Sequence, residues 1–230
     1  MSTEVRTMFA QIAPRYDLTN EVLSFGIHRL WRRAAVALSG AKAGDSVLDC
    51  ATGTGDLALA FKRRVGDSGT VVGVDFCQEM LAAAPEKASR AGLNVRFEVA
   101  DALALPFEDA SFDIASIAFG IRNVDDPVRC LRELSRVVRT GGRVVVLEFG
   151  QPRGAFGSLF RFYSRRIMPA VGGMLTGHRR AYEYLPRTAA AFPAGERFLG
   201  LMREADTFGA QSSHPLTFGT AFVYVGSVRR

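Results

Sequence analysis

Short apolar segments alternate with helical patterns between residues 47 and 149, and this alternation constrains the fold more than any other feature. The expected strands are Val47–Cys50, Thr70–Asp75, Val95–Ala100, Phe112–Phe119 and Arg143–Phe149. The expected helices are Leu57–Val65, Gln78–Ala91 and Val128–Val138. Strands that alternate with helices over about 100 residues predict a doubly wound, mostly parallel sheet of the α/β class.

The flanking segments are expected to cover and extend this sheet. Residues 1–40 predict an N-terminal helical cover, and the Arg- and aromatic-rich residues 151–200 predict a helical cap insert. Thr217–Val228 is expected to return as an antiparallel C-terminal strand. A chain of 230 residues, 48% of them hydrophobic, favours one domain, 1–230, over two.

Composition argues against several other classes of protein. Cys50, Cys77 and Cys130 lie far apart without paired spacing, so neither a disulfide framework nor a metal site is expected. The N-terminus has no long apolar core, and no apolar run reaches the roughly 18 residues of a membrane span. We therefore expect a cytoplasmic protein that meets any membrane only at its surface.

The net charge of +6 is concentrated in one segment. Residues 151–200 hold eight arginines against Glu183 and Glu196, and the rest of the chain balances to zero. A local basic excess indicates an anionic partner, either nucleic acid or a membrane surface. A solvated arginine face explains the same pattern equally well.

The stretch "VLDCATGTGD" places Gly53 and Gly55 in a turn after the first expected strand. The turn fits the loose form G-x-G-x-x-G/A, and Asp75 follows Gly53 by 22 residues, as in dinucleotide-binding proteins. Asp49 and Asp56 flank the turn, however, where they would repel a pyrophosphate.

A third acid, Asp101, follows the third expected strand. S-adenosylmethionine has no phosphate and carries a sulfonium and an ammonium, so carboxylates at neighbouring strand ends suit it. In this arrangement Asp75 would bind the ribose and Asp101 would lie near the adenine amine. The turn is therefore interpreted as a site for a cationic nucleotide.

Four stretches, "VLDCATGTGD", "VVGVDF", "VADALALPF" and "RVVRTGGRVVVLEF", resemble successive motifs of Rossmann-like class I methyltransferases. "YDLTNEVLSFGIHRLWRR", "AFGIRNVDD" and "AYEYLPRTAAAFP" are similar, more narrowly, to the ubiquinone/menaquinone biosynthesis C-methyltransferase family. The resemblance runs from about residue 8 to the C-terminus. It implies cofactor contacts at Thr54, Asp75, Asp101 and Ala102, with Asp49, Gly53 and Gly55 shaping the loop.

The resemblance implies C-methylation of a polyprenyl quinol by S-adenosylmethionine, with demethylmenaquinol favoured over the benzoquinol of ubiquinone biosynthesis. A ring carbon becomes nucleophilic when the adjacent hydroxyl loses its proton. Arg122 and Asn123 follow the fourth expected strand, where Arg122 could hold a phenolate or orient a water that passes the proton to Asp56. The alternative for both residues is a helix-start turn before Asp125.

His28 is a second candidate base, because its ordinary pKa lies near neutrality. It sits between Tyr16 and Trp31 in the N-terminal cover, and packing is the alternative role. Tyr16, His28, Trp31 and Tyr184 are the residues expected to contact the quinol.

The cap combines apolar and basic residues at helical spacing. Arg161 and Arg165 fall between its apolar positions, which are Phe156, Leu159, Phe160, Tyr163 and Ile167. This pattern is typical of an amphipathic helix, which either rests on a membrane surface or closes over the active site. A non-catalytic nucleotide- or RNA-binding module is the rival interpretation, but no basic-aromatic RNA platform is present, and no nucleic-acid partner is expected. The oligomeric state stays open.

Overall fold

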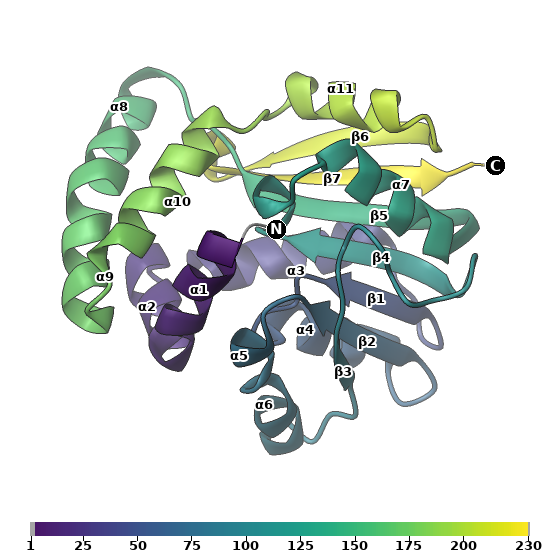
Figure 1. The fold of residues 1–230 in the computed structure, drawn as a ribbon. Coiled ribbons are helices and arrows are strands. Elements are labelled where there is room, and N and C mark those ends of the chain that lie inside the picture. Colours follow the sequence, from purple (N-terminus) through teal and green to yellow (C-terminus); the bar gives the residue numbers. More distant parts are fainter. Residues whose placement is uncertain (1–2, 230) are drawn as a thin grey trace.

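The computed structural model describes residues 3–229 and contains a seven-stranded sheet (Figure 1). The strands are β1 Ser46–Cys50, β2 Thr70–Asp75, β3 Arg96–Val99, β4 Phe112–Ala118, β5 Val138–Phe149, β6 Phe208–Leu216 and β7 Ala221–Val228. They lie in the order β3-β2-β1-β4-β5-β7-β6. Strands β1 to β5 pair in parallel, whereas β7 runs antiparallel to both β5 and β6. The expected doubly wound, mostly parallel sheet is therefore confirmed.

Helices cover both faces of the sheet and its carboxyl edge. They are α1 Thr3–Ile12, α2 Tyr16–Ser24, α3 Ile27–Ser39, α4 Asp56–Val65, α5 Gln78–Leu81, α6 Ala84–Arg90, α7 Pro127–Val137, α8 Gly154–Phe162, α9 Met168–Thr176, α10 Arg179–Ala191 and α11 Glu196–Ala205. Helices α3 and α4 pack on one face, and α7 and α11 on the other (Figure 1). Helices α1, α2, α8, α9 and α10 gather beyond the carboxyl ends of the parallel strands.

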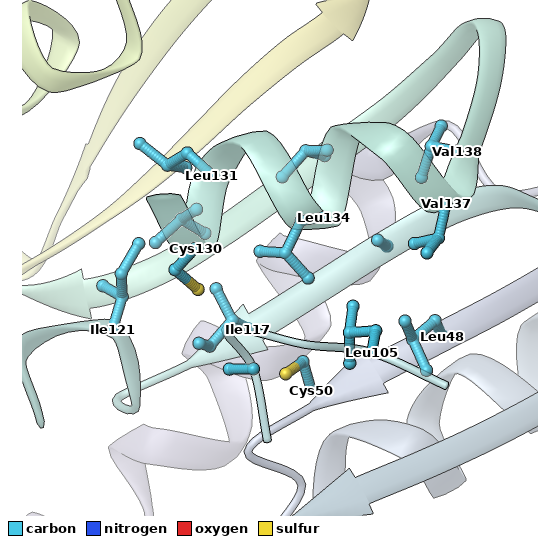
Figure 2. Close-up of a cluster of buried hydrophobic side chains, with 14 of the residues drawn as sticks. Leu48, Cys50, Leu105, Ile117, Ile121, Cys130, Leu131, Leu134, Val137 and Val138 are labelled. Carbon is cyan, nitrogen blue, oxygen red and sulfur yellow. The ribbon is translucent and has the colours of Figure 1, made fainter. Parts of the chain in front are cut away.

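The central strands are buried on both faces. Figure 2 shows Leu134 of α7 pointing toward the side chains of β4 and β1, and Leu134, Ile117 of β4 and Leu48 of β1 are all fully buried. A parallel strand covered by helices on both sides needs apolar residues at every position. This requirement explains why these strands appear in the sequence as continuous apolar runs.

The expected single helix Gln78–Ala91 is two helices, α5 and α6. Pro85 lies in the first turn of α6 and has no backbone N–H to donate to the carbonyl of Leu81. Proline suits the first turn of a new helix but not the interior of a long one. The prediction of one continuous helix was therefore wrong.

The C-terminal region holds two strands where one was expected. Thr217–Gly219 forms a 3₁₀ turn, so the last strand begins at Ala221, and β6 precedes the turn. Strand β6 lies at the sheet edge, contains Pro215 and is largely polar, so its sequence carries no strand pattern. Strand β5 also begins earlier than expected, at Val138.

The cap segment folds as α8, a π-helical turn at Tyr163–Ile167, and then α9 and α10. Ile12 and Leu23 from the N-terminal helices pack against Tyr182 of α10, so the N-terminal helices and the cap form one helical layer. None of the helices within residues 3–229 is both long and apolar enough to cross a bilayer.

Candidate active site

A small pocket lies at the carboxyl edge of the sheet, among the segments that follow the first four strands. Its volume is about 80 Å³, and Phe9 and Tyr16 from the N-terminal helices are part of its wall. We call it the edge pocket. Six residues of the predicted site line it: Tyr16, Gly53, Asp75, Asp101, Ala102 and Asn123.

The glycine turn is held by Asp75 at the end of β2. The Asp75 carboxylate accepts hydrogen bonds from the backbone N–H groups of Gly53 and Cys77, each at 2.8 Å. Gly53 and Gly55 both adopt positive φ. A Cβ on Gly55 would lie 3.1 Å from the Phe97 ring, so close packing also restricts this position to glycine. Burial raises the pKa of Asp75.

Asp49 lies beneath the turn and does not line the edge pocket. Its side chain accepts hydrogen bonds from the hydroxyls of Thr52, at 2.6 Å, and Ser116, at 2.7 Å. Burial raises the pKa of Asp49 to about 6, and the two hydroxyls oppose the rise. Asp49 therefore links the glycine turn to β4. From the sequence, its carboxylate was expected to face a cationic nucleotide in the pocket.

Thr54 and Asp56 belong to a charged network outside the edge pocket. The Thr54 hydroxyl donates to Asp17 of α2 at 2.6 Å, and the Lys87 ammonium donates to the other Asp17 oxygen at 2.6 Å. Lys87 also pairs with Asp56, which lies 3.3 Å from the guanidinium of Arg32. We call these five residues the latch, because they join the N-terminal helices to the glycine turn and α6.

A second, larger pocket lies between the N-terminal helices, the cap and the end of β5, with a volume of about 470 Å³. Aromatic side chains make much of its wall: Phe9, Tyr16, Phe25, Trp31, Phe119, Phe149, Phe156, Phe160, Phe162, Tyr163, Tyr182 and Tyr184. We call it the apolar pocket. Phe9, Tyr16 and Phe119 line both pockets, so the two meet at these side chains.

Arg122 lies at the wall of the apolar pocket, within the 3₁₀ turn Ile121–Asn123. Its Nη1 donates to a carboxylate oxygen of Glu148 at 2.9 Å and to the backbone carbonyl of Phe119. The two charged side chains are only 3% and 1% exposed, and the guanidinium lies 5.2 Å from the Phe149 ring centroid. Burial raises the pKa of Glu148, and the Arg122 charge opposes that rise.

Asn123 connects the two pockets through Tyr184. The Tyr184 hydroxyl, in the apolar pocket, donates to the Asn123 side-chain oxygen at 3.1 Å, while Asn123 itself lines the edge pocket. The alternative role for Arg122 and Asn123 was a turn that leads into the next helix. They do form a 3₁₀ turn before α7, and Asp126 caps that helix by accepting a hydrogen bond from the backbone N–H of Arg129.

The expected partnership of Arg122 with Asp56 does not occur in this arrangement, because Asp56 lies in the latch and lines neither pocket. Burial raises the pKa of Asp56, but the charges of Arg32 and Lys87 outweigh this and lower it. A carboxylate that is already paired with two cations is a weak proton acceptor.

His28 and Trp31 of α3 both line the apolar pocket. His28 Nε2 lies 3.0 Å from Glu21 and Nδ1 contacts Arg32, so both ring nitrogens are engaged. Burial lowers the pKa of His28, which keeps it neutral at neutral pH. The Trp31 indole N–H donates to the Thr217 hydroxyl at 2.9 Å.

The sequence patterns did not reveal Glu148, Asp17, Lys87 or Phe119 as parts of the site. Of these residues, only Glu148 could have been noticed in the sequence, because it is the one acid within the otherwise apolar run Val144–Phe149. Such a residue inside a buried strand requires a partner.

Comparisons with known proteins identify relatives of this chain. A model of the ubiE/COQ5 methyltransferase family matches residues 1–228. The Ubiquinone/menaquinone biosynthesis C-methyltransferase UbiE of Bdellovibrio bacteriovorus is 54% identical over 226 residues, which cover 98% of this chain and 96% of that one. The Demethylmenaquinone methyltransferase of Thermus thermophilus is 52% identical, with 95% and 99% covered.

Solved structures share the fold at lower identity. A SAM-dependent methyltransferase from Thermotoga maritima superposes with a TM-score of 0.68 at 21% identity, covering 97% of this chain and 99% of that one. A second SAM-dependent methyltransferase, from Aquifex aeolicus, has a TM-score of 0.64 at 21% identity, covering 86% and 89%. The fold, the matched family model and the relatives agree: the chain belongs to the ubiE/COQ5 methyltransferase family.

Proposed function

We propose that this protein transfers a methyl group from S-adenosylmethionine to a ring carbon of a polyprenyl quinol, with demethylmenaquinol as the acceptor. One observation carries the proposal: an edge pocket lined by carboxylates meets a large apolar pocket at Phe9, Tyr16 and Phe119. A polar, cationic donor and an apolar acceptor would meet at that junction. Relatives named as demethylmenaquinone methyltransferases, at 52% and 47% identity, support the naphthoquinol over a benzoquinol.

The residues of the edge pocket fit the methyl donor. Asp75 and Asp101 supply carboxylates, and Gly53 lines the pocket without a side chain. Gly53, Asp75, Asp101 and Ala102 would hold the donor, which supplies an electrophilic methyl group when bound. Phe9 and Tyr16 of the N-terminal segment would lie beside the bound donor.

The apolar pocket fits a quinol with a prenyl tail. Its aromatic wall excludes water, which strengthens any charge interaction within it. Two arginines, Arg32 and Arg122, line this wall, and Arg32 is paired with Asp56. Arg122 would stabilise the negative oxygen that develops as the quinol hydroxyl loses its proton. Asn123 and Tyr184 would position the ring between the two pockets.

An assay with labelled S-adenosylmethionine tests the proposal. Reduced demethylmenaquinol and the demethylated benzoquinol, each with a short prenyl tail, are supplied as acceptors, with bulk RNA as a third arm. We expect label on a ring carbon of the naphthoquinol, identified by mass spectrometry. Transfer to RNA alone, or to none of the three, would contradict the proposal.

We further propose that the mouth of the apolar pocket rests on an anionic membrane surface. Phe25, Leu159 and Phe162 line this pocket, yet they are 78%, 66% and 59% exposed, so they mark where it opens. The ring centroid of Phe218, which is 83% exposed, lies 5.2 Å from that of Phe156, another residue that lines the pocket. These five residues are called the mouth rim.

The backbone supports a binding role for the mouth rim. Phe25 and Phe218 adopt φ of 50° and 54°, in the left-handed region that bulky residues disfavour. Such strain persists where the surrounding structure holds it, and it gathers at ligand-binding sites. Here it presents two aromatic rings to solvent, where they would enter a lipid interface.

The exposed arginines of the cap favour an anionic membrane over a neutral one. Arg161, Arg165 and Arg166 are exposed on the same helical segment as Leu159 and Phe162, and none pairs with a carboxylate among residues 3–229. Each basic residue near an anionic surface contributes about 1 kcal/mol to binding. The prenyl tail of the acceptor would then enter the pocket directly from the bilayer.

Co-sedimentation with vesicles tests this docking. We expect binding to phosphatidylglycerol-containing vesicles, weaker binding to pure phosphatidylcholine, and loss of binding as salt rises. Leu159→Ser with Phe162→Ser should reduce binding, whereas Met174→Ser, an equally apolar and 83% exposed control on α9, should not. Equal effects of both variants, or self-association through the rim, would contradict membrane docking.

A further inference from the structure

Three residues that line the apolar pocket each have a buried polar group with no hydrogen-bond partner among residues 3–229. These groups are the Nε–H of Arg122 and the hydroxyls of Tyr182 and Thr220. Arg122 follows β4 and Thr220 precedes β7, whereas Tyr182 belongs to α10. Thr220 is only 3% exposed, and its carbonyl accepts a hydrogen bond from the Gly150 N–H at the end of β5. Buried donors are costly unless a partner satisfies them. Neighbouring atoms cover the Arg122 and Thr220 groups in this structure, so a ligand oxygen would satisfy them after a small shift of the pocket wall.

The orientation of the Arg122 guanidinium is set by contacts at Nη1 and at one face of its plane. Nη1 is held by the Glu148 carboxylate and the Phe119 carbonyl, and the plane lies against the Phe149 ring. Because a guanidinium is rigid and planar, fixing Nη1 and one face also fixes the direction of Nε. Glu148 is itself held, since the same oxygen accepts the Phe149 N–H at 2.8 Å.

Glu148 does not line either pocket, so it can reach a bound quinol only through Arg122. Without the Glu148 carboxylate, Arg122 would be an uncompensated charge in an apolar wall, and its side chain would turn toward water. A buried ion pair of this kind contributes little net stability, which leaves the positioning of Arg122 as its use.

Building on the proposed function, we propose that Glu148 positions Arg122 so that its Nε–H and the Thr220 hydroxyl together bind one oxygen of the quinol ring. Arg122 supplies the charge for the developing phenolate, and Thr220 supplies a neutral contact to the same oxygen. Glu148 is a positioning residue, and Thr220 is a substrate-binding residue.

A double-mutant cycle on kcat tests the role of Glu148. Glu148→Gln keeps an acceptor for Nη1 but removes the charge, and we expect kcat to fall about tenfold. Arg122→Ala should lower kcat by about 100-fold or more, and the double variant should be no slower than Arg122→Ala. The KM for S-adenosylmethionine should stay within about twofold throughout. Fold reductions that multiply in the double variant would overturn the positioning role.

A matched control separates positioning from general destabilisation. Asp113 also pairs with an arginine, Arg139, but at the opposite end of β4 from the pockets. Asp113→Asn should leave kcat per folded molecule unchanged. An equal loss of kcat in this variant would show that any weakened ion pair lowers turnover.

Thr220 has an independent test that does not depend on Glu148. Thr220→Val keeps the shape and removes the hydroxyl, so we expect the KM for the quinol to rise about tenfold, with no change in S-adenosylmethionine binding. Thr220→Ser should restore the wild-type KM. A wild-type KM in Thr220→Val would overturn this contact.

The wild-type protein provides a final check that needs no buried substitution. In a sample labelled with ¹⁵N at arginine Nε, 1,4-naphthohydroquinone should shift one Nε–H resonance and slow its exchange with water. Arg122→Lys identifies that resonance by its absence. An unchanged resonance would overturn the inference, whereas absence of methyl transfer to any quinol would instead contradict the proposed function.

Discussion

The hydroxyl of Thr54 in the glycine turn donates a 2.6 Å hydrogen bond to Asp17 of α2, across 37 positions of sequence. Lys87 of α6 completes the latch by donating to the same carboxylate. Phe9 and Tyr16 from the same N-terminal segment line the edge pocket. If the donor binds in this pocket as proposed, weakening the latch should speed its exchange.

Asp17→Asn is expected to accelerate release of S-adenosylmethionine. The Asp17 side chain is 45% exposed, so solvent screens its pairing with Lys87 and the expected increase is only about threefold to tenfold. Stopped-flow displacement of bound cofactor measures the rate. Glu86→Gln, which removes a surface ion pair beside Lys87, is the control and should leave the rate unchanged.

Asp75→Asn is expected to weaken S-adenosylmethionine binding by about 1–3 kcal/mol. The amide can accept only one of the two backbone hydrogen bonds that Asp75 accepts from Gly53 and Cys77, so the glycine turn loses one anchor along with the charge. Calorimetry on the folded variant measures the change. Wild-type affinity would show that Asp75 neither holds the turn nor contacts the donor.

Asp49 should make stability depend on pH between about pH 4 and pH 6, the interval between its ordinary pKa and its folded value of about 6. In this interval the unfolded chain releases the proton while the folded chain keeps it. Stability is therefore lost as the pH rises, by about 3 kcal/mol in total.

Asp49→Asn removes the titrating group and should remove this loss. The hydroxyls of Thr52 and Ser116 can rotate to meet an amide as well as a carboxyl. Urea unfolding of both proteins from pH 4 to pH 7 isolates the contribution of Asp49 as the difference between them. A difference that stays constant with pH would contradict the raised pKa.

The residues at the carboxyl edge of the sheet could be predicted from the sequence, because the chain topology alone determines which residues lie there. Asp75 and Asp101 each follow an apolar strand, and parallel strands bring their carboxyl ends to one edge. Both residues accordingly line the edge pocket. The same reasoning misplaced Asp56, because it follows the glycine turn on α4, whose first residue faces Arg32 and Lys87.

Pairings between distant side chains could not be predicted in this way. Arg122 and Glu148 are 26 positions apart in the sequence and lie at the ends of neighbouring strands. No local sequence pattern predicts that their side chains form an ion pair. The apolar pocket depends on how α8 and α10 pack against α1 and α2, which helical periodicity does not specify. The membrane contact of the cap stays a prediction.

The most direct measurement of the central claim is single-turnover methyl transfer to demethylmenaquinol with the cofactor already bound, comparing the wild type with Arg122→Ala. The reacting carbon is proposed to lie at the junction of the two pockets, beside Arg122. This placement predicts transfer by the wild type and a rate lower by about 100-fold or more in the variant, with S-adenosylmethionine affinity nearly unchanged. An equal rate in the two proteins would contradict it.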